Sequence, residues 1–495
     1  MKSAYKLLSI TLVTVVLSTS SCTNPLDVEP TSIISNASFW KTEDDVTGAL
    51  AGMYVKLRNE AQLNLFQLGE GRSEVMEWGK LVGTLDYDRL YLNTLDATFA
   101  GPSWIGFYST INAANLVIKY APNIPFRTEA AKNAALAQAY TMRAFVYFVL
   151  VRSWGDVPLR TEPTEGYSPE TTNKERAPKA EVFRQIKEDI DKALQLYPSN
   201  AFSAGRNTWS KAATNALKAD VYLWTAKQLN GGQADFTTAL EACNEVQKAD
   251  VELLPNYANV FAYTNKGNRE ILMAVRFQQL ESNNNYFENM YIPTFVVPSN
   301  TDQATKDIIG IPGGNIVWTP SALVRSQFTT DDQRRNASFL EIYTTDASGK
   351  KNYYGSIVLK GRGMVEGGVR NFKDDVILYR YADVLLMKAE AKNALGQDPS
   401  DEINQVRKRA YGTAFDKYAF TKGTKEQNDE AILKERLLEL AFEGKRWWDL
   451  IRFGKAFDIV PSLQNRKGQD HLLLFPISSY ILSLEPKVQQ NPGYN

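Results

Sequence analysis

Three segments of this chain repeat one pattern, in which a small residue precedes bulky apolar residues within a helical stretch. The segments are Ala144-Phe145-Val146-Tyr147-Phe148, Ala219-Asp220-Val221-Tyr222-Leu223 and Ala382-Asp383-Val384-Leu385-Leu386. A second amphipathic helical pattern follows each of them, over residues 182–197, 236–248 and 401–411. Small residues let two helices approach closely, and bulky residues fill the gap to the next pair. The sequence therefore predicts a mainly α-helical body built from stacked helix pairs.

This pairing follows the logic of tetratricopeptide-type repeats, whose unit is about 34 residues. The interval between the second and third segments is much longer, so the repeats are interrupted. The interruption, residues 251–375, is rich in Asn, Gly, Pro and aromatic residues, and its alternating pieces at 271–277 and 354–360 are predicted strands. Loops this long usually carry binding function. We therefore expect a helical part over 39–250, a loop-rich, ligand-facing insertion over 251–375, and a second helical part over 376–495 that packs on the first.

Helix-capping residues and helical periodicity support the same division. Ser38 or Thr42 can cap a helix that runs to about Arg58. Residues 130–154 are apolar on every side towards their end, so that helix is expected to lie inside the protein. Core packing is the favoured role of Trp104, Trp154, Trp447 and Trp448. Two pairs in the last helical block, Arg436 with Glu439 and Arg446 with Asp449, are three residues apart and are interpreted as structural ion pairs.

The N-terminus has the pattern of a secretion signal. Lys2 and Lys6 precede an apolar run over 7–18, which is too short to cross a hydrocarbon core of about 30 Å. Small residues then lead into Cys22, as at a bacterial lipoprotein cleavage site. We therefore expect a signal peptide over 1–21, lipidation of Cys22, and a tether over 22–38. The alternative is a secreted protein in which this cysteine is incidental.

Charge and histidine content exclude several functions. The chain has 56 Lys and Arg against 56 Asp and Glu, which argues against nucleic-acid binding. His471 is the single histidine, so metal sites with two imidazoles are excluded, and a Ser–His or Cys–His nucleophile would need that residue. We expect His471 to be structural and Cys243 to be a small core residue. No metal, cofactor or catalytic residue is expected. These arguments do not exclude carboxylate chemistry, such as glycoside hydrolysis.

The C-terminal block resembles a known family. Residues 435–450, Glu-Arg-Leu-Leu-Glu-Leu-Ala-Phe-Glu-Gly-Lys-Arg-Trp-Trp-Asp-Leu, are similar to the C-terminal signature of the SusD/RagB family, the outer-membrane nutrient-binding lipoproteins of Bacteroidota. Further landmarks occur in the family's order at 39–40 with 48–54, 104–118, 143–159, 380–391 and 490–494. The resemblance implies four tetratricopeptide-like helix pairs and a lipid-anchored protein on the outer membrane, facing the cell exterior. It also implies a SusC-like TonB-dependent transporter as partner, and an oligosaccharide, or in some members a peptide, as ligand.

Sugar binding calls for flat aromatic rings, which cover C–H faces, and for planar polar groups that engage two hydroxyls. Residues 70–88 and 283–318 combine both kinds of side chain in loop-like sequence. Their candidate ligand-binding residues are Arg72, Trp78, Tyr87, Asn284, Tyr286, Tyr291 and Trp318. Trp78, Tyr286 and Trp318 are the first choices. For each aromatic residue, packing of the loop onto the scaffold is the alternative.

Three functions therefore stay open. The preferred one is non-enzymatic capture of a glycan for uptake, or of a peptide by a member of the same family. A surface glycoside hydrolase would need only two carboxylates, but the helical-repeat body offers no barrel whose strand ends could carry them. A scaffold that binds only other proteins would not need the aromatic, Asn-rich insertion.

Overall fold

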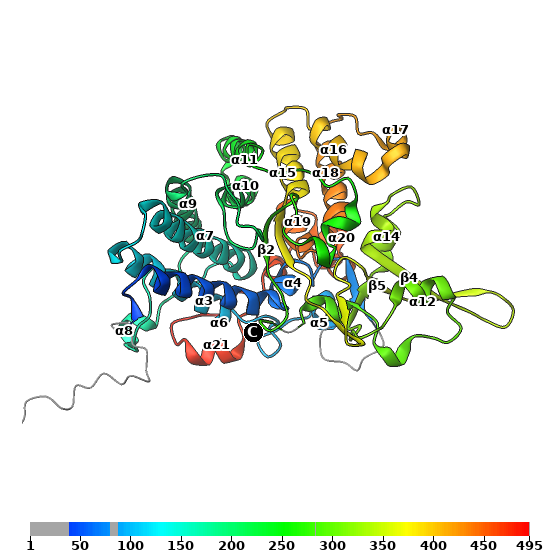
Figure 1. Cartoon of the computed structure of the whole chain (residues 1–495), viewed down its shortest axis with the longest axis horizontal. Helices are drawn as coiled ribbons and strands as arrows, with labels where there is room; N and C mark the ends of the chain where they lie inside the picture. Colours follow the sequence, from blue (N-terminus) through cyan, green and yellow to red (C-terminus); the bar gives the residue numbers. More distant parts are fainter. Residues whose placement is uncertain (1–38, 80–87, 283, 495) are drawn as a thin grey trace, which may run out of the picture.

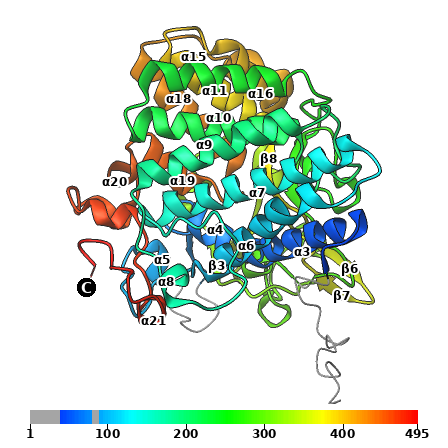
Figure 2. The same cartoon turned by 90° about the vertical axis from the view of Figure 1, so that its left-hand side faces the viewer.

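The computed structural model describes residues 39–79, 88–282 and 284–494. Long helices form contacting pairs, α3 with α6, α7 with α9, α10 with α11 and α15 with α16. Figure 2 shows them stacked from α3 and α6 at the bottom to α15 at the top. Their bounds are α3 (Glu43–Ala61), α6 (Ile105–Tyr120), α7 (Glu129–Trp154), α9 (Lys179–Leu196), α10 (Lys211–Gln228), α11 (Gly232–Val246), α15 (Tyr381–Ala394), α16 (Ser400–Tyr411) and α18 (Lys425–Leu440). The predicted fold, mainly α with stacked helix pairs, is confirmed.

The small residues of the repeated pattern lie where the helices meet. Ala144 on α7, Ala219 on α10 and Ala382 on α15 have no exposed surface. Thr42 caps α3 in a reciprocal box with Asp45, which satisfies backbone N–H groups that the first helical turn leaves unpaired. The other predicted cap, Ser38, lies outside the described residues.

Helix α7 is the interior helix that its composition predicts. Within the described residues it alone is long and apolar enough to cross a membrane, but 83% of its most apolar window is buried inside the protein. It ends at Gly155, whose φ of 74° favours glycine. Trp154 on α7, together with Trp104, Trp447 and Trp448, is buried as predicted, and so is Cys243 on α11. Burial raises the pKa of the Cys243 thiol well above its usual value, as expected for an inert core cysteine.

The segment between the helical parts is built from short elements, which lie mostly on the right-hand side of Figure 1. Strand β2 pairs with β8 in antiparallel register, and the predicted strands at 271–277 and 354–360 correspond to β2 and β5. The described residues form four two-stranded sheets, β1 (Met76–Trp78) with β3 (Trp318–Pro320), β2 (Ile271–Val275) with β8 (Val376–Arg380), β4 (Phe339–Thr345) with β5 (Lys351–Val358), and β6 (Met364–Glu366) with β7 (Val369–Asn371). The remaining α-helices are α4 (Asn64–Gly69), α5 (Asp88–Tyr91), α8 (Pro169–Thr172), α12 (Gln303–Ile309), α13 (Ala322–Arg325), α14 (Arg334–Ser338), α17 (Phe415–Tyr418), α19 (Arg446–Arg452), α20 (Ala456–Ile459) and α21 (Ser479–Leu484).

Buried ion pairs join this segment to the C-terminal helices. Arg380 Nη1 lies 2.8 Å from Glu270 Oε1 and 2.5 Å from Glu439 Oε1, and its Nε lies 2.8 Å from Glu443 Oε2. Arg334 extends the cluster to Glu435 at 2.7 Å. All six side chains are buried. The last helical block is therefore held to the insertion by charge as well as by apolar packing.

The predicted short-range ion pairs are wrong in their partners. Arg436 binds Asp383 and Asp449, both at 2.8 Å, rather than Glu439. Arg446 binds Glu74 at 2.7 Å rather than Asp449. Both arginines are structural as expected, but they are satisfied by residues distant in sequence. In a buried site, well-placed partners on other elements outweigh a neighbour three residues away.

Candidate functional site

The ribbon of β1 and β3 brings together two of the predicted ligand-binding residues. Trp78 is paired directly with Trp318, 240 positions away in the sequence. Residues opposite each other in an antiparallel pair place their side chains on the same face. On that face Trp318 contacts the ring of Phe66, with centroids 5.6 Å apart, and Tyr286 stacks on Phe66 at 4.5 Å. The three preferred aromatic residues therefore belong to one cluster around α4.

Burial separates the members of this cluster. Trp318 and Tyr286 are each 2% exposed, whereas Trp78 is half-buried at the open end of the ribbon. The Tyr286 hydroxyl donates to the carbonyl of Phe442 at 3.3 Å. Tyr291 is also fully buried, and its hydroxyl donates to the carbonyl of Ile309 at 2.7 Å. Direct ligand contact is thus not supported for Tyr286, Tyr291 or Trp318, which pack the loop onto the scaffold.

Arg72 is a further correction. Its guanidinium has no exposed surface and lies between the rings of Trp447 and Phe475, 4.7 and 4.8 Å from their centroids. Its donors bind Asn93 Oδ1 and the carbonyl of Leu474, both at 2.7 Å, and the carbonyl of Leu472. Arg72 therefore fixes the C-terminal segment and cannot reach a ligand.

The remaining candidates have separate outcomes. Asn284 is half-buried, and its Oδ1 accepts a hydrogen bond from the backbone N–H of Phe372 at 2.8 Å, so its carbonyl oxygen is already used. Tyr87 and Cys22 lie outside the described residues. His471 packs edge-on against Tyr494, with ring centroids 5.0 Å apart. That contact agrees with the structural role expected for the single histidine.

Accessible groups near Trp78 gather on the other face of the same ribbon. Glu77 and Thr319 are paired there, and Thr319 donates to the carbonyl of Ser356 on β5 at 2.7 Å. Tyr353, also on β5, is 42% exposed, and the Arg325 guanidinium lies 4.2 Å from its ring centroid. We call the group Glu77, Trp78, Tyr91, Arg325 and Tyr353 the ribbon-edge surface, which extends around the edge of the ribbon because Trp78 and Glu77 belong to opposite faces.

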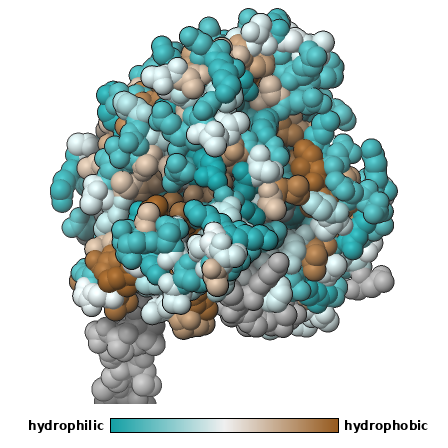
Figure 3. Space-filling view, turned by 90° about the vertical axis from the view of Figure 1, so that its right-hand side faces the viewer, coloured by the Kyte–Doolittle hydropathy of each residue, from teal (hydrophilic) through white to brown (hydrophobic). Residues whose placement is uncertain are grey.

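Burial and nearby charge raise the pKa of both phenols on this surface. Burial is the main cause that raises the pKa of the Tyr353 phenol, and the nearby charge of Glu77 adds to it. Burial also raises the pKa of the Tyr91 phenol, again with a contribution from Glu77. Glu77 thus faces both phenols. Figure 3 shows that the face on the right-hand side of Figure 1 is mainly hydrophilic with separate apolar patches.

Sequence reasoning missed Tyr91 and Tyr353. Tyr91 ends α5, just beyond the segment 70–88 that was predicted to bind ligand. Tyr353 lies one residue before the alternating piece 354–360, which was interpreted only as a strand. Alternation along β5 could have indicated that one of its tyrosines faces outward.

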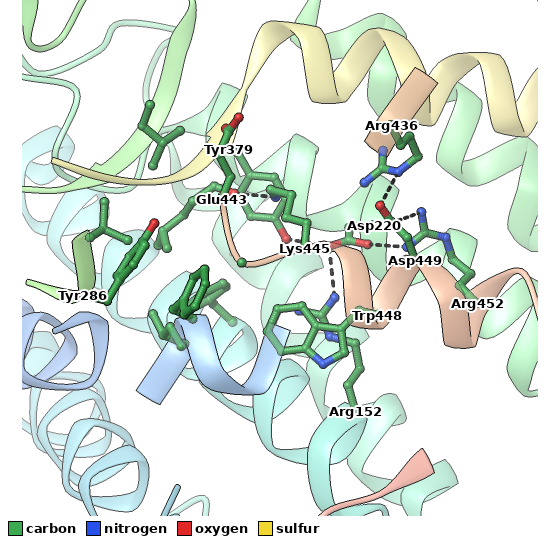
Figure 4. Close-up of a pocket in the computed structure, with 17 residues that line it drawn as sticks. Arg152, Asp220, Tyr286, Tyr379, Arg436, Glu443, Lys445, Trp448, Asp449 and Arg452 are labelled. Carbon is green, nitrogen blue, oxygen red and sulfur yellow. Dashed lines mark hydrogen bonds and ion pairs between the residues drawn. The ribbon is translucent and has the colours of Figure 1, made fainter. Parts of the chain in front are cut away.

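A small cavity lies deeper, where α4, α7, α10 and the last helical block meet (Figure 4). It holds about 40 Å³, enough for a few water molecules but not for a sugar ring. Figure 4 shows it bordered by Arg152, Asp220, Arg436 and Arg452, which belong to a buried ion cluster. Its walls join the N-terminal and C-terminal helices, so its role is structural. Within the described part of the chain, no three His, Cys, Asp or Glu side chains are arranged to hold a metal ion.

Comparison with known proteins identifies the family. A family model described as the SusD family matches residues 262–494, and one described as starch-binding associating with outer membrane matches 26–223. A SusD-like protein of Formosa agariphila is 30% identical to the chain, and the alignment covers 96% of each protein. The chain belongs to the SusD family. This confirms the resemblance found in residues 435–450 and in the earlier landmarks.

Solved structures of other SusD superfamily members have the same fold. NanU of B. fragilis has a TM-score of 0.82 and 36% identity, with 94% of this chain and all of that chain covered. A SusD superfamily protein of Bacteroides vulgatus has a TM-score of 0.83 and 34% identity, with 92% of this chain and all of that chain covered. The starch-binding protein SusD of Bacteroides thetaiotaomicron is more distant, at 22% identity over 72% of each chain.

Proposed function

We propose that this SusD-family protein is a non-catalytic, lipid-anchored glycan-capture protein of the outer membrane. It would bind an oligosaccharide at the cell exterior and deliver it to a SusC-like TonB-dependent transporter. The family models support this proposal, because one describes starch binding and association with the outer membrane and together the two match most of the chain. The observation that carries the binding role is the ribbon-edge surface, where two accessible aromatic residues are framed by a carboxylate and a guanidinium.

The ribbon-edge surface suits a sugar in its chemistry. Trp78 and Tyr353 offer flat faces to the C–H groups of a pyranose ring. Glu77 can accept from two neighbouring hydroxyls, and Arg325 can donate to ring or glycosidic oxygens. Arg325 already binds Glu341 at 2.5 Å, so its guanidinium is held in place before ligand arrives. Tyr87 and Asn284 remain proposed ligand contacts.

We expect Trp78→Ala to weaken glycan binding at least tenfold. Removing a half-buried indole from the centre of a contact surface typically costs more than 1 kcal/mol. The measurement is titration calorimetry of the mature chain with the glycan that binds best on an array. Tyr480→Ala is the matched control, because Tyr480 is 63% exposed on α21, away from the ribbon. Equal affinity of the Trp78→Ala variant and the unmodified chain would contradict the assignment.

Two alternatives are outcomes of the same experiments. If peptides bind the ribbon-edge surface and no glycan does, the protein is a peptide-binding member of the family. Reducing ends released from a polysaccharide incubated with the pure protein would instead indicate a glycoside hydrolase. Co-purification of the transporter with the tagged, full-length lipoprotein tests the proposed partner.

Lipid anchoring predicts an all-or-none result for Cys22→Ser. The thiol is the side-chain group to which the lipid would be attached, so the variant should leave the membrane pellet and lose incorporation of a labelled fatty acid. A single acyl chain holds a protein on a membrane only weakly, so the unmodified protein should carry more than one. Cys243→Ser is the control, because that buried residue should leave membrane association unchanged. Membrane retention of the Cys22→Ser variant would contradict lipidation at this residue.

A further inference from the structure

A groove of about 660 Å³ lies between the N-terminal and C-terminal helical parts. Its lining comes from the ends of α7 and α10, the beginning of α9, the helices α19 and α20, and the chain at 470–474 and 491–492. In Figure 2, α20 lies at the left, beside α9 and α10. The volume is within the range of small-molecule sites, about 300–1,000 Å³. None of these elements carries a residue of the ribbon-edge surface.

Hydrogen bonds hold the walls of the groove together. Arg176 donates from Nε to the carbonyl of Asp156 at 2.7 Å and from Nη1 to the carbonyl of Gln489 at 2.9 Å. It therefore joins the chain after α7 to the C-terminal segment. On another side, the amide nitrogen of Gln228 on α10 donates to the carbonyl of Ile451 on α19 at 3.1 Å. A groove that is in place before its ligand arrives loses less conformational freedom on binding.

The indole of Trp224 gives the groove a donor without a partner. Trp224 lines the groove and is 6% exposed. Its ring lies edge-on to that of Phe148, with centroids 6.2 Å apart, which fixes its orientation. Its Nε1–H has no hydrogen-bond partner among the described residues, and unlike the unpaired Nε1–H of Trp209 it is not shielded from solvent. A ligand oxygen that accepts from Trp224 would supply the missing hydrogen bond.

The groove also offers an accessible aromatic ring. Phe457 on α20 is half-buried and lines the groove together with Phe183 and Trp224. A flat ring of this kind suits the C–H face of a sugar.

The charges that line the groove balance one another. Arg152 is compensated by Asp220, 3.4 Å away. The other charged residues of the lining are Arg176, Lys179, Asp156 and Asp470. With His471 counted as neutral, two cations stand against two carboxylates, so the lining favours a neutral ligand. Hydroxyl groups both donate and accept, and they therefore match a lining that offers donors and acceptors together.

We propose that this groove is a second carbohydrate-binding site, specific for a neutral oligosaccharide of about two or three units. One sugar ring lies on Phe457, and a sugar oxygen accepts from Trp224 Nε1. Hydroxyl groups donate to Asp156 and Asp470. The choice of ligand class rests on the proposed function, but the groove shares no residue with the ribbon-edge surface. The protein thus binds glycan at two separate places.

The test measures the groove in a Trp78→Ala chain, so that the ribbon-edge surface does not contribute. The protein lacks residues 1–22, a deletion that removes none of the described residues. The neutral probes are maltotriose, laminaritriose, cellotriose, xylotriose and mannotriose, and trigalacturonate is the anionic comparison. Titration calorimetry measures affinity, and soaked crystals locate the probe. We expect at least one neutral trisaccharide to bind in the groove, and trigalacturonate to bind more weakly.

Two substitutions in the same background test the assigned contacts. Phe457→Ala should weaken binding of that trisaccharide at least about tenfold. Phe415→Ala is its matched control, because Phe415 is also half-buried on a four-residue helix, α17, and should leave the affinity unchanged. Trp224→Phe removes the N–H but keeps most of the ring, and should weaken binding about three- to tenfold. Trp209→Phe removes an indole N–H that is shielded from solvent and should have no effect.

The proposal is overturned if none of the neutral trisaccharides occupies the groove at about 20 mM, or if trigalacturonate binds more tightly. Equal affinities of the Phe457→Ala and Phe415→Ala chains would also overturn it, provided that their melting temperatures show folded proteins. If Phe457→Ala does not fold, Trp224→Phe decides in its place.

Failure of the groove and failure of the ribbon-edge surface give different patterns. Suppose that Trp78→Ala alone leaves the affinity for the best array glycan unchanged while a trisaccharide occupies the groove. The ribbon-edge assignment then fails and the groove stands. Loss of array-glycan binding in Trp78→Ala, with no trisaccharide in the groove, supports the ribbon-edge surface and overturns the second site.

Discussion

Arg380→Met is expected to destabilise the protein by about 3–5 kcal/mol, because it removes one partner from a buried ion cluster. Arg380 is fully buried and makes five short contacts, with Glu270, the side chain and carbonyl of Glu439, and both oxygens of Glu443. Methionine fills much of the same volume but leaves these carboxylates facing one another without their shared cation. The free energy of unfolding measured in urea should fall accordingly, and the protein should precipitate at a lower temperature.

Arg269→Met is the matched control for this experiment. Arg269 also pairs with two carboxylates, Asp250 at 2.6 Å and Glu252 at 2.7 Å, but its side chain is 52% exposed. Exposed pairs contribute about 0–1 kcal/mol, so this variant should unfold almost like the unmodified chain. A double variant, Arg380→Met with Glu439→Gln, should lose less stability than the sum of the single variants, because it removes one of the uncompensated charges. If Arg380→Met lowers the free energy of unfolding as little as Arg269→Met does, the cluster does not hold the insertion in place.

The helical part of this fold could be predicted because its determinants are local. Ala144, Ala219 and Ala382 lie within their own helices, and the patterns around them repeat in sequence, so helix pairing could be inferred without knowing the packing partner. Thr42 is a similar case, because a capping box is complete within four residues. The family signature at 435–450 added the identity of the scaffold, which the comparisons confirm.

The candidate site could be predicted only in part, because burial in a loop is decided by distant residues. Trp78 and Trp318 were both selected for their aromatic rings, and the ribbon does pair them. Trp318 packs against Phe66 and is buried, whereas Trp78 stays half-buried. The burial of Tyr291 and Arg72 could not be predicted for the same reason, since a polar aromatic loop has the same composition whether it faces a ligand or the core.

The ion clusters were not predictable from spacing. Arg436 and Glu439 are close in sequence, yet each is satisfied by other partners, Arg436 by Asp383 and Glu439 by Arg380. Those partners lie more than fifty positions away, on α15 and at the end of β8. The spacing of charged residues on a helix indicates which side chains share a face, but not which long-range partners the fold brings to them.

The second large effect is a loss of stability as the pH rises from about 5 to about 7.5. Two buried carboxyl groups cause it. Burial raises the pKa of Glu70 to about 7, although backbone N–H groups of Phe442, Gly444 and Lys445 bind its oxygens at 2.6, 2.6 and 3.1 Å. Burial also raises the pKa of Asp374 to about 7. Glu70 sits in a tight position, because a Cβ atom on the preceding Gly69 would lie 1.8 Å from the carbonyl oxygen of Gly444.

The sign of the effect follows from proton binding. Between the ordinary carboxyl pKa near 4 and the raised value near 7, the folded state holds a proton that the unfolded state has released. Stability therefore falls as the pH rises through this interval, by about 3–4 kcal/mol for each of the two groups, and does not change further above it. Below pH 4 the opposite trend should set in, because arginine partners lower the pKa of Glu390 to about 2 and also lower that of Glu439. Maximum stability is thus expected near pH 5.

Urea unfolding from pH 3 to pH 9 measures the dependence of stability on pH. The Glu70→Gln variant shows how much of that dependence comes from Glu70. The amide cannot titrate, so the slope between pH 5 and pH 7.5 should decrease by about half, with Asp374 left to account for the rest. The variant should also be less stable at every pH in that range, because its N–H₂ group faces a backbone N–H donor around residues 442–445. The readout is therefore the slope rather than the stability itself. A slope unchanged by Glu70→Gln would show that Glu70 stays ionised in the folded protein, held so by its three backbone donors.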